Sequence, residues 1–132
     1  FRLMTGSIML THDFYEPCYV QAAKVRRIID NDFIAGFEKC DLIVTPSAMG
    51  VAFKLNDDLT DKESDECAAM LIAANMSGLP ACSVPAGRNK DGLPLGIQVI
   101  GRRFDDVRVL QMAREIEKIV DLDNRPTIIM GK

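Results

Sequence analysis

The stretch "MSGLPACSVPAGRNKDGLPLGIQVIG", residues 76–101, holds the strongest structural signals of the chain. Gly78 is well placed to end a helix, because glycine readily adopts the left-handed conformation of a helix C-cap. Pro80 prevents the helix from continuing. The chain is therefore expected to leave a helix at Gly78 and enter a strand at "ACSVP", residues 81–85.

A second strand is predicted at "LGIQVIG", residues 95–101. Asp91 and Gly92 lie between the two strands and favour a turn, so the strands should form a hairpin. Gln98 is the only polar side chain of the second strand. Because alternation with polar residues is missing, this strand is expected to be covered on both faces.

Other elements are expected on either side of the hairpin. "DLIVTP", residues 41–46, reads as a short buried strand closed by proline. "CAAMLIAAN", residues 67–75, is apolar nearly all round and predicts a buried helix, which "TDKE" at residues 60–63 would start with a capping box. "QMAREIEKIV" belongs to a last helix that begins near Asp105 and Asp106.

Two helices are predicted to be amphipathic, since their apolar residues recur every three or four positions. The first runs from Pro17 to about Glu38, with Pro17 in its first turn. Its apolar face consists of Cys18, Ala22, Val25, Ile29, Phe33 and Phe37, and the face of the last helix consists of Val107, Leu110, Ala113, Ile116 and Val120.

These elements predict an α/β fold, part of a mixed central sheet flanked by helices. Three or four strands make only part of such a sheet, and the chain begins at Phe1 without an initiator methionine. We therefore expect residues 1–132 to be a fragment of one larger domain. An exposed sheet edge would then need a partner.

Composition excludes several classes of function. The 132 residues are 48% hydrophobic and 27% charged, with a net charge of -3, so this chain is a poor candidate for gripping a phosphate backbone. The four cysteines form no CxxC pair and His12 is the only histidine, which argues against a zinc site or a secreted disulfide framework. Free thiols buried in the core of a protein from a reducing compartment are expected, and no segment is apolar over the length of a membrane span.

Catalytic groups are hard to find among these residues. Ser83 and Cys82 lie on a predicted strand without the sharp turn that exposes a nucleophilic serine, and nothing ties His12 to either of them. Both side chains are therefore expected to be packed in the core. The lysines lie in polar or helical-surface contexts, and the adjacent carboxylates are better explained as helix caps. The chemistry alone predicts the non-catalytic part of an α/β enzyme.

"SGLPACSVPAG" followed by "DGLPLGIQVIGRRFDD" resembles the C-terminal core of the amidase signature family. Upstream, "RLMTGSIML", "QAAKVRRIIDNDF" and "CDLIVTP" resemble, in order, stretches of the family's glutamine-hydrolysing subunits of tRNA-dependent amidotransferases. The resemblance implies that residues 1–132 form the C-terminal fragment of a single amidase domain. It also implies that a Ser-Ser-Lys catalytic set lies earlier in the parent chain, so the fragment itself is expected to be inactive.

The resemblance further implies partners and cofactors. The parent would hydrolyse glutamine and pass ammonia to other amidotransferase subunits, where ATP and magnesium serve to amidate Glu-tRNA(Gln). This chain would hold no cofactor, bind no metal and contact no membrane. Its expected location is the mitochondrial matrix, or alternatively bacterial cytoplasm. Two other functions stay open, a general amidase of the same family and a non-enzymatic interaction module.

Two substrate-binding residues follow from the resemblance. Arg2 matches an arginine thought to hold the α-carboxylate of the substrate, a role that suits its planar fork of donors. The glutamine-hydrolysing subunits usually carry an aspartate seven residues before the asparagine that is Asn75 here, and that position is Ala68. Asp65, one turn earlier, is the candidate substitute for binding the substrate amino group. Ala68 also puts glutamine specificity in question.

Overall fold

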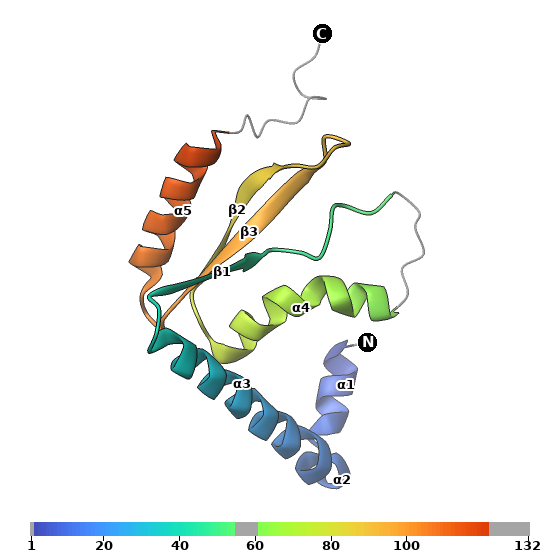
Figure 1. The fold of residues 1–132 in the computed structure, drawn as a ribbon. Coiled ribbons are helices and arrows are strands. Elements are labelled where there is room, and N and C mark those ends of the chain that lie inside the picture. The colour runs from blue at the N-terminus through green and yellow to red at the C-terminus, as the bar shows by residue number, and fades with distance from the viewer. Residues whose placement is uncertain (1, 55–60, 122–132) are drawn as a thin grey trace. The chain divides into compact units, whose positions relative to one another are not determined.

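The computed structural model describes residues 2–54 and 61–121, with side chains for residues 3–54 and 68–121. The chain divides into two compact units, Phe1–Lys39 and Cys40–Lys132. The first unit is entirely helical in its described part, and the second combines a sheet with two helices (Figure 1). The interpretation of residues 1–132 as part of one domain stays a prediction.

The first unit contains an almost continuous helical run. Its elements are α1 (Arg2–Met9), α2 (His12–Phe14), the π-helix η1 (Tyr15–Val20) and α3 (Gln21–Phe37). The predicted long helix is confirmed, but Pro17 lies inside η1 rather than in a first turn. Proline lacks an N–H and its ring presses on the carbonyl one turn earlier, and the wider π-turn accommodates both defects.

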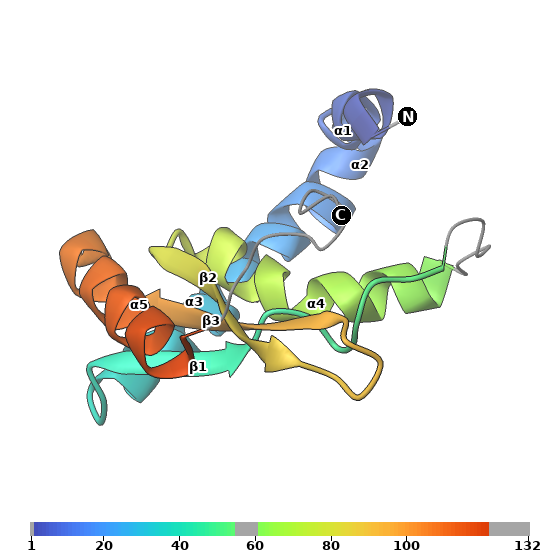
Figure 2. The same cartoon turned by 90° about the horizontal axis from the view of Figure 1, so that it is seen from above.

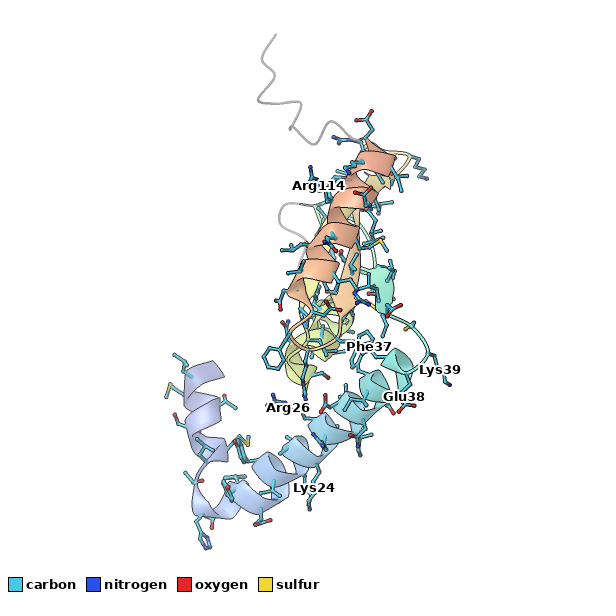
Figure 3. The ribbon with its side chains drawn as sticks, turned by 90° about the vertical axis from the view of Figure 1, so that its left-hand side faces the viewer. Lys24, Arg26, Phe37, Glu38, Lys39 and Arg114 are labelled. Carbon is cyan, nitrogen blue, oxygen red and sulfur yellow. The ribbon has the colours of Figure 1, made fainter. Side chains whose placement is uncertain are left out.

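The predicted apolar face of the long helix is buried only toward its C-terminal end. Phe37 is buried and its ring centroid lies 6.4 Å from that of Phe33, whereas Val25 is more than half exposed. The charged side chains of Lys24 and Arg26 are exposed and project outward from α3 (Figure 3). Asp30, by contrast, is only 4% exposed, and Arg27 Nη1 donates to its carboxylate at 3.2 Å.

The second unit is built on an antiparallel sheet. Its elements are β1 (Leu42–Pro46), α4 (Asp61–Ser77), β2 (Ala81–Arg88), β3 (Pro94–Gly101) and α5 (Asp106–Val120) (Figure 2). The strand order is β1-β3-β2, so β2 and β3 form the predicted hairpin and β3 is central. No parallel pair occurs among the described strands; they supply an antiparallel portion of the expected sheet.

The side chains of Asn89 and Arg88 both hold the hairpin loop, and Arg88 Nη1 donates to the carbonyl oxygen of Gly92 at 2.9 Å. The Oδ1 atom of Asn89 accepts hydrogen bonds from the backbone N–H groups of Asp91 and Leu93, both at 2.9 Å. Gly92 has a φ of +80°, which explains the glycine at this turn position. The predicted turn at Asp91 and Gly92 is therefore confirmed.

Helices pack on both faces of β3. Gln98 Nε2 donates to the carbonyl oxygen of Met70 on α4 at 3.2 Å, whereas a Cβ added at Gly101 would meet Val109 of α5. Because residues 98 and 101 have opposite parity in an unbulged strand, α4 and α5 lie on opposite faces. Val99 is completely buried, and the predicted burial of both faces is confirmed for residues 98–101, whereas Leu95 near the start of the strand is exposed.

The buried faces of the two helices differ from the sequence prediction. In α5, Val109 and Ala113 are buried, while Val107 and Leu110 are 68% and 60% exposed. The helix is rotated so that Val109 enters the space above Gly101, which no residue count along α5 alone can reveal. The expectation that α4 is buried all round is also wrong. Leu71 and Ile72 are exposed, whereas Ala74 is buried, because only one side of the helix faces the sheet.

Helix α4 ends at Gly78, as the sequence predicted. Gly78 has a φ of +62°, and its N–H donates to the carbonyl oxygen of Asn75 at 3.2 Å. The N–H of Leu79 donates to the carbonyl oxygen of Ala74 at 3.1 Å. These two bonds form a Schellman motif, in which a left-handed residue closes the helix.

Arg103 reinforces this helix end. Its Nε and Nη2 atoms donate to the carbonyl oxygen of Ser77 at 3.3 and 2.9 Å, where the negative end of the α4 dipole lies. We expect Arg103→Met to lower the free energy of unfolding by about 1 kcal/mol, measured by urea denaturation. Arg114→Met, at an exposed position on α5, is the matched control and should change it by less than about 0.5 kcal/mol. Equal effects of the two substitutions would contradict this role.

Candidate functional site

Ser83 and Cys82 lie in a regular strand. Ser83 is exposed and pairs with Gln98, whereas Cys82 is half-buried and pairs with Val99. The expectation that both side chains are packed in the core is therefore wrong for Ser83. Because β2 continues through both residues, neither is raised on the sharp turn that a nucleophilic serine requires.

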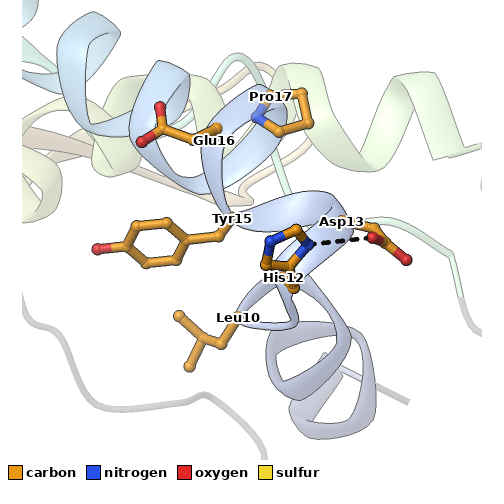
Figure 4. A pocket seen from close by; sticks show the side chains of 6 residues that line it. All are labelled: Leu10, His12, Asp13, Tyr15, Glu16 and Pro17. Atoms are coloured by element: carbon orange, nitrogen blue, oxygen red, sulfur yellow. Dashed lines mark hydrogen bonds and ion pairs between the residues drawn. The ribbon is translucent and has the colours of Figure 1, made fainter.

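His12 lies in the first unit, at the edge of an open surface pocket. The pocket has a volume of about 670 Å³, and its lining residues are Leu10, His12, Asp13, Tyr15, Glu16 and Pro17 (Figure 4). The exposed His12 Nδ1 lies 3.3 Å from Asp13 Oδ1. The lining includes no serine, cysteine or lysine, so these side chains do not form a Ser-His or Cys-His pair.

The described lysine side chains are exposed to solvent, which does not suit a catalytic lysine. Lys118 Nζ lies 2.6 Å from Glu115 Oε1, and this hydrogen bond and charge lower the pKa of Glu115. A lysine that activates a nucleophilic serine must be desolvated. The lysines whose side chains are described are all exposed: Lys24, Lys39, Lys54, Lys90 and Lys118.

Asp105, at the start of α5, belongs to an ion-pair cluster at the surface. Arg108 Nη1 lies 2.8 Å from Asp41 Oδ1, and Arg108 Nε lies 3.0 Å from Asp105 Oδ2. Asp105 occupies the N-cap position of α5 without a side-chain cap hydrogen bond, so the predicted capping role is replaced by ion pairing. Among the described side chains, those of residues 3–54 and 68–121, no group of three His, Cys, Asp or Glu could hold a metal ion.

The described cysteines are free thiols, as the sequence predicted. Cys18 and Cys82 are half-buried, but Cys40 is exposed, so the interpretation of these cysteines as core residues is wrong at position 40. Cys40 lies in the turn between α3 and β1, where its carbonyl oxygen accepts a hydrogen bond from Arg102. No described helix is long and apolar enough to cross a membrane.

The two predicted substrate-binding residues lie on helices of different units. Arg2 is the first residue of α1, and Asp65 lies within α4, but both side chains are outside the described part of the structure. Ala68, half-buried on α4, offers only a methyl group at the position where an aspartate was expected. The roles of Arg2 and Asp65 stay predictions.

Sequence reasoning missed a set of buried hydroxyl groups. Thr45 Oγ1, Ser47 Oγ and Ser77 Oγ are inaccessible to solvent and have no hydrogen-bond partner among the described residues. In the sequence, "TPS" at residues 45–47 shows only that the two hydroxyls are two positions apart. Their burial depends on the pairing of β1 with β3, which the sequence pattern alone does not specify.

Comparisons with known proteins give consistent findings. The family model described as amidase matches residues 1–110. The chain is 41% identical over 132 residues to the A subunit of glutamyl-tRNA(Gln) amidotransferase from Caldanaerobacter subterraneus subsp. tengcongensis, covering 99% of this chain and 27% of the relative. It is 38% identical to the protein of that name in Thiobacillus denitrificans, covering 91% of this chain and 25% of the relative.

Solved structures agree in fold. The crystal structure of the A subunit of glutamyl-tRNA(Gln) amidotransferase from Thermotoga maritima matches with a TM-score of 0.75 and 40% identity, over 89% of this chain and 26% of the other. A bacterial aryl acylamidase of the amidase signature family matches with a TM-score of 0.61 and 26% identity, over 76% of this chain and 24% of the other. The chain thus spans about a quarter of the length of the proteins it matches. The expected α/β fold, a fragment of the amidase signature architecture, is confirmed.

Proposed function

The chain belongs to the amidase family, and on that basis we propose that it is the C-terminal piece of the glutaminase subunit of a tRNA-dependent amidotransferase. The observation that carries the proposal is the difference in identity. The chain is 40% identical to the Thermotoga maritima amidotransferase subunit but 26% identical to the aryl acylamidase, although both share its fold. The bacterial relatives from Caldanaerobacter and Thiobacillus carry the amidotransferase name as well.

In the proposed reaction, glutamine and water give glutamate and ammonia. A serine of the parent chain attacks the carboxamide carbon, the C–N bond breaks, and ammonia leaves as the acyl-enzyme forms. Water then cleaves the acyl ester and restores the serine. The ammonia amidates Glu-tRNA(Gln) at another subunit, with ATP and magnesium bound there. This chain contributes part of the sheet and one wall of the substrate pocket.

The substrate-binding roles belong to this proposal. Arg2 would pair with the substrate α-carboxylate through two parallel hydrogen bonds. Asp65 is the only proposed partner from this chain for the substrate amino group. The Caldanaerobacter and Thiobacillus relatives are bacterial, which supports bacterial cytoplasm rather than the mitochondrial matrix as the location.

Ala68 favours one alternative function, a general amidase acting on small or acyl amides. A methyl group cannot pair with the ammonium of an amino acid, so loss of the aspartate removes a reason to prefer glutamine over simple amides. The third possibility, a non-enzymatic interaction module, has no comparable observation in its favour.

The test measures ammonia release by the full-length parent protein with its partner subunits. We expect turnover of glutamine, stimulated by tRNA, and no detectable turnover by the 132-residue chain alone, because the Ser-Ser-Lys set is expected upstream.

Ala68→Asp in the parent should raise kcat/KM for glutamine and leave kcat/KM for a simple aliphatic amide unchanged. Turnover of the simple amide alone would instead establish the general amidase, and activity of the isolated chain would refute its expected inactivity.

A further inference from the structure

Phe104 occupies an unfavourable position for a large apolar residue. It is the third residue of the turn between β3 and α5, which is closed by a hydrogen bond from the Asp105 N–H to the carbonyl oxygen of Arg102 at 3.0 Å. Its φ is +65°, a left-handed conformation that suits glycine and is strained for a residue with a Cβ. Its side chain is 96% exposed. A ring in solvent gains no burial that could offset the strain of this backbone conformation.

Exposed apolar side chains continue from Phe104 along one side of α5. Val107 and Leu110 follow at steps of three residues, and residues three apart in a helix lie on the same side. Both are more than half exposed, whereas Val109 and Ala113 are buried on the side of α5 that faces the sheet. Phe104, Val107 and Leu110 together form the α5 outer face. A group of exposed apolar side chains of this kind indicates a surface on which another polypeptide segment packs.

The length of the relatives and the extent of the family match indicate what packs there. The chain spans 27% of the Caldanaerobacter relative, so most of that protein has no counterpart in residues 1–132. The match to the amidase family model covers residues 1–110 and therefore includes the whole α5 outer face. A surface inside the region that the family shares favours an occupant that the family also shares, the rest of the amidase domain, over a subunit specific to amidotransferases.

We propose that the α5 outer face packs against the part of the parent chain upstream of residue 1, with the ring of Phe104 as its main apolar anchor. The inference rests on the proposed function, in which residues 1–132 are the C-terminal piece of a longer subunit. Burial of an aromatic ring is strongly stabilising, and this gain offsets the backbone strain at Phe104. The same packing removes Val107 and Leu110 from water.

The sign of a change in Tm tests the proposal at Phe104. In a solvent-exposed turn, Phe104→Gly would relieve backbone strain and raise Tm. If the ring is packed, the same substitution removes a buried aromatic side chain, and we expect Tm of the full-length parent to fall by about 3 °C or more in thermal unfolding followed by circular dichroism. Asp121→Gly is the matched control, because Asp121 is exposed and also has a positive φ, +42°, and it should not lower Tm. A Phe104→Gly variant as stable as the parent would overturn the proposal.

Val107→Ala gives a second test of sign within α5. Alanine is the better helix former, so this substitution would raise Tm if Val107 were in solvent. We expect Tm of the full-length parent to fall instead, because two methyl groups are lost from a packed surface. A rise in Tm would contradict the burial of the α5 outer face.

A spectroscopic probe identifies the occupant without removing the ring. The nitrile stretch of p-cyanophenylalanine placed at position 104 differs in infrared frequency between water and apolar surroundings. We expect the apolar frequency in the full-length parent purified without other subunits, at every protein concentration, and also after removal of residues 122–132. An apolar signal that requires another subunit, a high protein concentration or residues 122–132 would assign the face to a different occupant and overturn the proposal. A hydrated signal under all these conditions would overturn it as well.

These measurements fail independently of the test of the proposed function. Glutamine turnover by a parent in which the ring is hydrated would overturn the packing of the α5 outer face and leave the function standing. Turnover of the simple amide alone, by a parent in which the ring is buried, would overturn the amidotransferase function and leave the packing standing.

Discussion

Gly101→Ala is expected to lower the free energy of unfolding by about 2 kcal/mol, because a single methyl group overfills the contact between β3 and α5. The added Cβ would overlap Val109 Cγ2 and lie 3.6 Å from Leu42 Cδ2. Gly101 and Val109 are both buried, so neither side chain can move into solvent. Urea denaturation monitored by circular dichroism measures the loss.

Two variants separate this packing effect from a general cost of alanine. Val109→Ala removes the overlapping methyl group, so the double variant Gly101→Ala/Val109→Ala should lose clearly less stability than the sum of the two single losses. Gly50→Ala is the matched control, since a Cβ added there meets nothing within 4 Å, and its effect should stay below about 0.5 kcal/mol. Strict additivity of the pair would show that Gly101 and Val109 do not compete for the same space.

The contrast between β3 and α5 shows what the sequence can predict. "LGIQVIG" predicts a strand covered on both faces, because a run of apolar residues without alternation has only one satisfactory environment. In α5, several sets of apolar residues fit a helical period, and the contact at Gly101 selects the set that contains Val109. The existence of a helix depends on local sequence, whereas its rotation depends on the surface against which it packs.

The same contrast between local sequence and long-range packing applies to the other features of the chain. Sequence patterns located the helix end at Gly78 and the turn at Gly92, since positive φ values select glycine locally. They did not reveal the buried hydroxyls of Thr45 and Ser47, because burial there results from the pairing of strands that are far apart in the chain. Nor does a local pattern identify a substrate pocket whose proposed nucleophile belongs to another part of the parent.

Gly78→Val should lower the free energy of unfolding by about 2 kcal/mol. The cause is backbone strain and not crowding, which is the cause at Gly101. Nothing lies within 4 Å of a Cβ added at Gly78, so there is room for the side chain. The cost is in the backbone, because a φ of +62° is unfavourable for any L-residue with a Cβ and most of all for a β-branched one. The valine variant must either bear this strain or lose the Schellman hydrogen bonds that end α4.

The nature of the substituting side chain distinguishes these explanations. Asparagine tolerates the left-handed conformation better than valine, so Gly78→Asn should retain much of the stability, with both variants measured as shifts of Tm. At Gly101, by contrast, asparagine should have no advantage over other residues, because this position does not have a positive φ. An unchanged Tm for Gly78→Val, or equal losses for valine and asparagine, would show that α4 ends without needing the left-handed residue. The expected ranking of glycine, then asparagine, then valine would instead attribute the helix end to the backbone conformation of this single position.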